Sequence, residues 1–241
     1  MRTGNGSSLS GFRDIVIDVS RPTSDLAALF QRTAQRYRDS GRFAHNYVAA
    51  KLRRDPVNRE ILALAAEEPL GDIVDIGCGR GQLDVALLDA GLARSVVGLD
   101  CHADHVKQGR RAAAGLAFSA VVQDLAACQD VPPATTVLLI DVLYQLEPRV
   151  QMLLLQAAVR AARQRIIIRT LDPALGLRSS LTLWLEKLMR RVSPHSGKHV
   201  VVRPVSCIVQ TLNAAGFATS VTPCWQGTPF ANVLIIGRAI A

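Results

Sequence analysis

Three glycines and an aspartate at close spacing form the most informative chemical motif of the chain. Gly77, Gly79 and Gly81 follow a short apolar run, and glycines let a backbone approach a ligand where a side chain would block it. Asp75 lies two residues before the first glycine, and its carboxylate would repel a phosphate but attract a cation. A dinucleotide fingerprint requires a small residue where this chain has Gln82. The loop therefore favours a cationic small molecule over NAD or FAD.

S-adenosylmethionine carries both an ammonium and a sulfonium, and so meets this requirement. The segment Asp75–Gly81 resembles D-x-G-x-G-x-G, the first motif of class I S-adenosylmethionine-dependent methyltransferases. In that family the second strand ends in an acid that binds the ribose hydroxyls, which corresponds to Asp100. The third strand ends in an acid near the adenine amino group, which corresponds to Asp124, and Asp141 resembles the fourth motif, beside the methionine part and the acceptor. Four acids at such intervals are far more specific than any one alone.

The resemblance covers about residues 70–170, and the segment up to residue 237 is consistent with it. It implies a cofactor site along successive strand ends, with S-adenosylmethionine in contact with Asp75, Gly77, Cys78, Gly79, Gly81, Asp100, Cys101, Asp124, Leu125, Asp141 and Val142. Cys101 also has His102 and His105 as neighbours in the sequence, which suggests a metal site. Because this compact cluster has no distant fourth ligand, the sequence predicts no metal.

Short apolar runs alternate with helical patterns after Pro69, which is typical of parallel strands covered by helices on both faces. The runs are Asp72–Ile76, Ser95–Leu99, Phe118–Val122, Val137–Ile140 and Arg165–Ile168. Two more runs, Ala218–Thr222 and Asn232–Ile236, are too close together for a helical crossover and should be antiparallel. The sequence predicts an α/β fold with a doubly wound, mostly parallel sheet of seven strands, an antiparallel last strand and helices on both faces.

The segments outside these alternating strands and helices have other sequence patterns. One helix should end near Arg38, and another should begin near Asp55, which can cap it ahead of Pro56. We expect a flexible tail at 1–20, a helical cap at 21–68, and a methyltransferase domain at 69–241 that contains a lid insert at 172–203.

Charge and cysteine content limit the possible classes of protein. The 241 residues carry a net charge of +8, but residues 61–159 hold six basic and twelve acidic side chains. Residues 160–203 hold ten basic and two acidic side chains, so the basic excess flanks an acidic centre.

No apolar run is long enough for a transmembrane segment, and the N-terminus lacks a signal-peptide core. Five scattered cysteines without C-x-x-C spacing indicate reduced thiols in a cytoplasmic protein.

The acceptor is constrained mainly by exclusion. Residues 141–144 lack the [DNS]-P-P-[YFW] pattern that is typical of enzymes acting on the amino groups of bases. A basic segment that binds nucleic acid should also contain several aromatic residues, but Trp184 is the lone one in 170–203. Nucleic acid is therefore an unexpected partner. The insert 172–203 has apolar residues along one face of a helix. This face either packs against the rest of the domain or covers an apolar acceptor. Its cations would suit an acidic acyl carrier protein or peripheral contact with an anionic membrane. Segments 47–56 and 227–234 resemble small methyltransferases of secondary-metabolite and aryl-polyene-type pathways.

An oxygen acceptor usually requires a proton acceptor as well. The candidates are Tyr144, His195 and His199. We expect Tyr144, Arg169 and Trp184 to contact the acceptor. The sequence thus predicts methyl transfer, preferably to oxygen, on a small apolar or carrier-tethered acceptor. An RNA or protein methyltransferase and a catalytically silent cofactor-binding subunit remain open alternatives.

Overall fold

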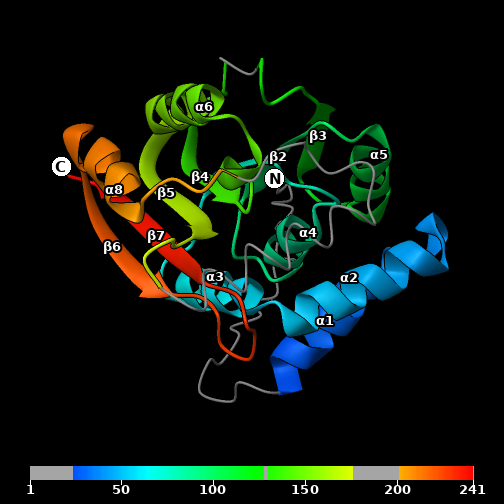
Figure 1. Cartoon of the computed structure of the whole chain (residues 1–241). Helices are drawn as coiled ribbons and strands as arrows, with labels where there is room; N and C mark the ends of the chain where they lie inside the picture. Colours follow the sequence, from blue (N-terminus) through cyan, green and yellow to red (C-terminus); the bar gives the residue numbers. More distant parts are fainter. Residues whose placement is uncertain (1–23, 128–129, 176–200, 241) are drawn as a thin grey trace, which may run out of the picture.

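The computed structural model describes residues 24–127, 130–175 and 201–240 (Figure 1). The predicted tail, most of the predicted lid insert, and the predicted site residues His195, His199 and Trp184 lie outside these ranges.

Seven strands form one sheet in the order β3-β2-β1-β4-β5-β7-β6. They are β1 Asp72–Ile76, β2 Ser95–Asp100, β3 Phe118–Val122, β4 Ala134–Ile140, β5 Ala162–Leu171, β6 Phe217–Pro223 and β7 Asn232–Ala239. Strands β1 to β5 are parallel, and β7 is antiparallel to both β5 and β6, so the predicted fold class is confirmed. Strands β4 and β5 begin three residues earlier than their apolar runs, because their first residues alternate with polar ones such as Thr136 and Arg163.

Seven α-helices and two short 3-10 helices are described. They are α1 Ser24–Gln35, η1 Arg38–Ser40, α2 Arg42–Arg54, α3 Pro56–Glu67, α4 Gln82–Asp89, α5 Ala103–Ala112, η2 Leu143–Gln145, α6 Pro148–Ala161 and α8 Val205–Ala214. Asp55 caps α3 as predicted, since its carboxylate accepts a hydrogen bond from the backbone N–H of Val57 at 3.2 Å. The sequence did not distinguish α2 as a separate helix, because only Ala44, Val48 and Leu52 of its 13 residues are buried. None of the described helices is long and apolar enough to cross a membrane.

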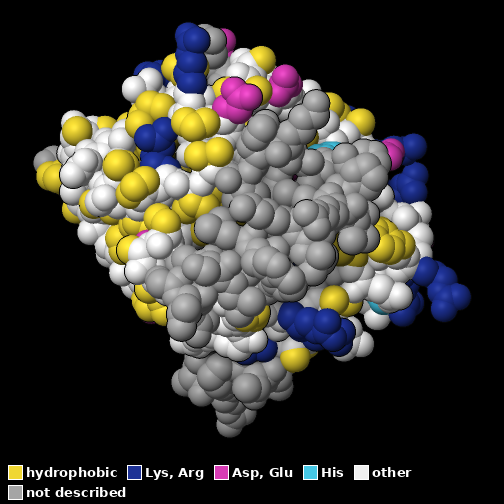
Figure 2. All heavy atoms as spheres, in the orientation of Figure 1, with side chains coloured by type: hydrophobic (Ala, Val, Ile, Leu, Met, Phe, Trp, Pro, Cys, Tyr) yellow, Lys and Arg dark blue, Asp and Glu magenta, His cyan; other side chains and the backbone are white. Residues whose placement is uncertain are grey.

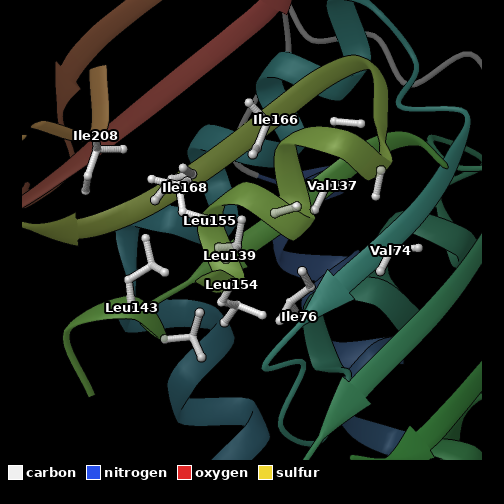
Figure 3. Packing of buried hydrophobic residues seen from close by; sticks show 14 of the residues in the cluster. Val74, Ile76, Val137, Leu139, Leu143, Leu154, Leu155, Ile166, Ile168 and Ile208 are labelled. Atoms are coloured by element: carbon white, nitrogen blue, oxygen red, sulfur yellow. The ribbon is translucent and has the colours of Figure 1, made fainter. Parts of the chain in front are cut away.

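Two apolar cores cover the two faces of the sheet and fix its strand ends. One contains side chains of α6 and α8, and Figure 3 shows Leu154 and Leu155 of α6 against Ile76, Leu139 and Ile168 of three neighbouring strands. The other contains side chains of α1 to α5. Burial of each large aliphatic side chain contributes about 1.5–3 kcal/mol, so the strand ends are held on a rigid support. Strand β1 lies between β2 and β4 at the point where the strand order reverses, which is where such sheets bind ligands.

Candidate active site

The glycine loop connects β1 to α4 at this reversal point. Gly77, Gly79 and Gly81 have φ values of 83°, 57° and 68°, a region that other residues rarely adopt. A Cβ atom on Gly77 would lie 2.9 Å from a methyl group of Val142, so the absence of a side chain lets the ends of β1 and β4 meet. A Cβ atom on Gly79 would meet nothing within 4 Å. The loop therefore leaves open space at the carboxyl edge of the sheet.

Asp100, the last residue of β2, is bound to this loop. Its Oδ2 accepts a hydrogen bond from Gly79 N at 2.9 Å, and its Oδ1 accepts one from His102 N at 2.8 Å. The side chain is nearly buried, with the residue 7% exposed. A carboxylate has about four acceptor positions, so Asp100 retains capacity for further donors such as hydroxyl groups. The predicted contact with ribose stays a prediction.

Asp75 is paired with a second buried acid that the sequence did not single out. Asp75 is 4% exposed and Asp84, in the first turn of α4, is 0% exposed. Their carboxyl groups contact each other, and Oδ1 of Asp75 has no hydrogen-bond partner among the described residues. Burial and the neighbouring Asp84 raise the pKa of Asp75 well above its usual value, and burial raises the pKa of Asp84 to about 7. The two acids therefore share a proton near neutral pH, unlike the simple carboxylate that the motif suggested.

This pair should make stability depend on pH. Because both pKa values are raised on folding, the folded protein binds more protons than the unfolded chain, and the free energy of unfolding should fall as the pH rises from about 4 to about 7. Asp84→Asn removes one of the acids and should raise the free energy of unfolding at pH 8 by up to about 4 kcal/mol, with little change at pH 4. Urea unfolding at several pH values measures this. Asp104→Asn, an exposed acid on α5, is the control, and equal pH slopes for wild type and Asp84→Asn would refute the assignment.

A second buried cluster joins the N-terminal helices to the ends of β4 and β5. Arg169 Nη1 lies 2.6 Å from Asp55 Oδ1 and 3.1 Å from Asp141 Oδ2. Lys51 Nζ lies 2.8 Å from Asp55 Oδ2. Although burial opposes it, Lys51 and Arg169 lower the pKa of Asp55, so its carboxylate is charged. The cluster ties α2 and the start of α3 to the edge of the sheet beside the glycine loop.

Two predicted residues lie in this second cluster. Asp141 follows β4 and is the only described non-glycine residue with positive φ, at 60°. Burial raises its pKa, while Arg169 and Lys51 oppose that rise. Arg169 was expected to contact the acceptor, and the structure gives its guanidinium two carboxylate partners from the protein itself. A role in positioning Asp141 follows directly from that geometry.

Other predicted residues have different surroundings. Tyr144 is 5% exposed on η2, and its carbonyl accepts a hydrogen bond from Val201 N at 3.1 Å. Asp124 is exposed and its carboxylate accepts from Ala126 N at 2.9 Å, which makes a local turn. Leu125 is buried in the core that α6 and α8 cover. Cys101 is exposed at the end of β2.

Cys78 was expected to contact the cofactor, but its side chain is buried beneath the loop. A Cβ atom on Gly98 of β2 would lie 2.6 Å from its Sγ, so Gly98 makes room for this thiol. Burial raises the pKa of Cys78, which makes it an inert thiol. Any ligand contact of Cys78 would therefore come from its backbone.

The N-terminal helices also hold the glycine loop directly, a contact that the sequence did not reveal. The guanidinium of Arg80 lies over the ring of Tyr47 at 4.6 Å and near the ring of Phe43 at 5.9 Å. The Tyr37 hydroxyl donates a hydrogen bond to the carbonyl of Arg80 at 2.7 Å. Figure 1 shows α1 and α2 beside α4, which the loop precedes. These helices thus form one wall of the candidate site.

The sheet order, the antiparallel β7 and the glycine loop held by an acid of β2 define a class I methyltransferase fold. Residues 73–165 match the family model described as a methyltransferase domain. Over these residues, which contain the glycine loop, the chain is therefore similar to a methyltransferase domain. No curated protein matches the chain by sequence.

Solved structures show the same fold over most of the chain. Magnesium protoporphyrin IX methyltransferase from Synechocystis PCC 6803 with bound SAM is 18% identical, with a TM-score of 0.59 over 97% of this chain and 100% of that one. An O-methyltransferase family protein from Burkholderia thailandensis is 16% identical, with a TM-score of 0.60 over 94% and 71%. A chain from the complex between the Haloferax volcanii Trm112 methyltransferase activator and the putative methyltransferase is 16% identical, with a TM-score of 0.61 over 88% and 98%. At these identities the likeness establishes the fold alone.

Proposed function

We propose that the chain is a cytoplasmic enzyme that transfers the methyl group of S-adenosylmethionine to a small, largely apolar or acyl-carrier-tethered acceptor, preferably at oxygen. The observation that carries this proposal is the edge of the sheet at β1 and β2. There Gly79 borders open space, Asp100 is fixed beside it, and the buried Asp75 and Asp84 lie at the start of the same loop and of α4. A cationic ligand with a ribose fits a cradle of this chemistry.

The residues that would hold the cofactor come from four strand ends. The residues are Asp75, Gly77, Cys78, Gly79, Gly81, Asp100, Cys101, Asp124, Leu125, Asp141 and Val142, with Cys78 contributing through its backbone. When bound, S-adenosylmethionine supplies an electrophilic methyl group on a sulfonium. Arg169, which Asp55 also binds, holds Asp141 in place. Tyr144 is the proton acceptor that we propose among the described residues.

Apolar groups near the same edge support an apolar acceptor. Segment 224–231, which contains Trp225 and Phe230, connects β6 to β7 and is fixed by a hydrogen bond from Asp172 N to Ala231 O at 2.8 Å. Asp172 directly follows the carboxyl end of β5, so this segment lies at the edge that carries the glycine loop. Val142 follows β4 at the same edge. Such a surface suits an aromatic or acyl chain better than a polyanion.

The distribution of basic groups argues against RNA as the acceptor. On the face shown in Figure 2, Lys and Arg side chains of the described residues lie at separate places rather than in one patch. Several arginines are engaged by acids, as in the pairs of Arg32 and Arg36 with Asp89. Phosphate-backbone binding requires a continuous basic surface.

A transfer assay with methyl-labelled S-adenosylmethionine tests the proposal. The acceptors are an apolar phenol, an acyl chain on acyl carrier protein, total RNA and a protein extract. We expect label on the phenol or the acyl chain, with at least tenfold less transfer by Asp100→Ala and wild-type transfer by Asp104→Ala. Label only on RNA or protein would favour the alternative enzyme class. Binding without transfer to any acceptor would favour a silent subunit.

A further inference from the structure

Four side chains with metal-ligating atoms gather where β2 ends and α5 begins. Nδ1 of His102 lies 3.1 Å from Asp100 Oδ1 and 3.2 Å from Cys101 Sγ. The ligand atoms of these three residues all lie within 4.8 Å of one another. Nδ1 of His105 lies 4.0 Å from the same oxygen of Asp100, and its ring centroid is 4.8 Å from that of His102. A thiol, an imidazole and a carboxylate thus lie together, with a second imidazole beside the carboxylate.

The two separations at His102 are close to those of a tetrahedral metal site, whereas His105, at 4.0 Å from Asp100 Oδ1, would have to move closer when an ion binds. Zinc binds nitrogen and oxygen at about 2.0–2.2 Å and sulfur at about 2.3 Å, so neighbouring ligand atoms of a tetrahedron are roughly 3.3–3.6 Å apart. The two short separations around His102 differ from that range by only a few tenths of an ångström. Cys101, His102 and His105 already formed the cluster seen in the sequence, and the structure adds Asp100, the last residue of β2, as a fourth ligand.

We propose that Asp100, Cys101, His102 and His105 form a binding site for a divalent cation that prefers sulfur and nitrogen ligands, of which Zn²⁺ is the model. Cys101 is exposed, and His102 and His105 are partly exposed, so an ion reaches the site from solvent. The donor set matches such a cation better than Mg²⁺ or Ca²⁺, which prefer oxygen ligands. The Cys101 thiol loses its proton when the cation binds.

Occupation of this site has a consequence for the cofactor, and this part of the inference rests on the proposed function. Asp100 is the acid that we assign to the ribose hydroxyls, and a metal ion would take its Oδ1. Metal and cofactor therefore exclude each other, and the cation acts as an inhibitor. By linkage, each ligand weakens the other by the same factor.

Cobalt spectroscopy of the full chain tests the metal site without reference to activity. Co²⁺ added to the phosphine-reduced protein should give the visible bands of tetrahedral cobalt and a thiolate-to-cobalt charge-transfer band, and Zn²⁺ should remove both. Cys101→Ser should abolish the charge-transfer band, and His105→Gln should weaken Co²⁺ binding at least tenfold. Cys207→Ser, on α8, is the matched control and should retain the wild-type spectrum. A charge-transfer band that survives Cys101→Ser, or no tetrahedral spectrum at stoichiometric cobalt, would overturn the site.

Calorimetry with S-adenosylhomocysteine tests the exclusion separately. The Zn²⁺-saturated protein should bind this ligand at least tenfold more weakly than the metal-free protein, and Cys101→Ser should reduce that difference. Unchanged affinity of the zinc-loaded protein would overturn the exclusion. If the metal-free protein fails to bind S-adenosylhomocysteine, the proposed function fails, and the cobalt spectrum still decides the metal site.

Discussion

Arg169→Met should lower the free energy of unfolding by about 3–5 kcal/mol, the usual cost of leaving a buried charge without its partner. Arg169 is 3% exposed and holds the carboxylates of Asp55 and Asp141. Methionine matches the length of the side chain but supplies no charge, and Lys51 alone would then face two buried acids. The loss should be smaller at pH 5 than at pH 8, because the acids can take up a proton. Urea unfolding at both pH values measures the effect.

Arg94→Met is the matched control for this prediction. Arg94 also pairs with an aspartate, Asp72, but the side chain of Arg94 is 72% exposed. Exposed pairs contribute about 0–1 kcal/mol, so this variant should unfold close to wild type. Equal stability losses in the two variants would show that the Arg169 cluster is no more than a surface ion pair.

Asp100→Ala should weaken the binding of S-adenosylhomocysteine about 10- to 100-fold, since a hydrogen bond to a charged group contributes about 1.5–3 kcal/mol. The substitution removes the acceptor assigned to the ribose hydroxyls and also releases Gly79 N, which Asp100 holds at 2.9 Å. Both effects act in the same direction, because a loose glycine loop must be ordered again when the ligand binds. Isothermal titration calorimetry gives the two affinities.

Asp104→Ala, four residues further along the chain, controls for the loss of a negative charge near the site. It should bind the ligand as wild type does, and both variants should show wild-type circular dichroism. If Asp100→Ala binds as tightly as wild type, Asp100 does not belong to the cofactor site.

Local patterns made the sheet and the loop predictable. Most residues of the central strands β1, β4 and β7 are apolar and buried, and the β2 acid follows the D-x-G-x-G-x-G motif at a family-like interval, so the sequence singled out Asp75 and Asp100. Asp84 was missed because it lies among Leu83, Ala86 and Leu87 on a short helix, where an acid normally faces solvent. Its burial arises from the packing of α4 beneath the glycine loop.

Long-range pairing explains the other differences between sequence and structure. Arg169 and Asp55 are 114 residues apart, and no local pattern links them. The stacking of Tyr47 on Arg80 likewise joins a helix before the sheet to the loop after β1. Residue types and their spacing thus predicted the positions of the strand ends. The partners of Arg169 and Arg80 depend instead on how the N-terminal helices pack against the sheet.

Calorimetric titration of the wild-type protein with S-adenosylhomocysteine and with NAD tests the central claim most directly. A cradle of acids at the strand ends predicts one bound S-adenosylhomocysteine per chain at micromolar affinity and no binding of NAD. Folded protein that gives no heat with S-adenosylhomocysteine at millimolar concentration, or that binds NAD instead, would contradict the account.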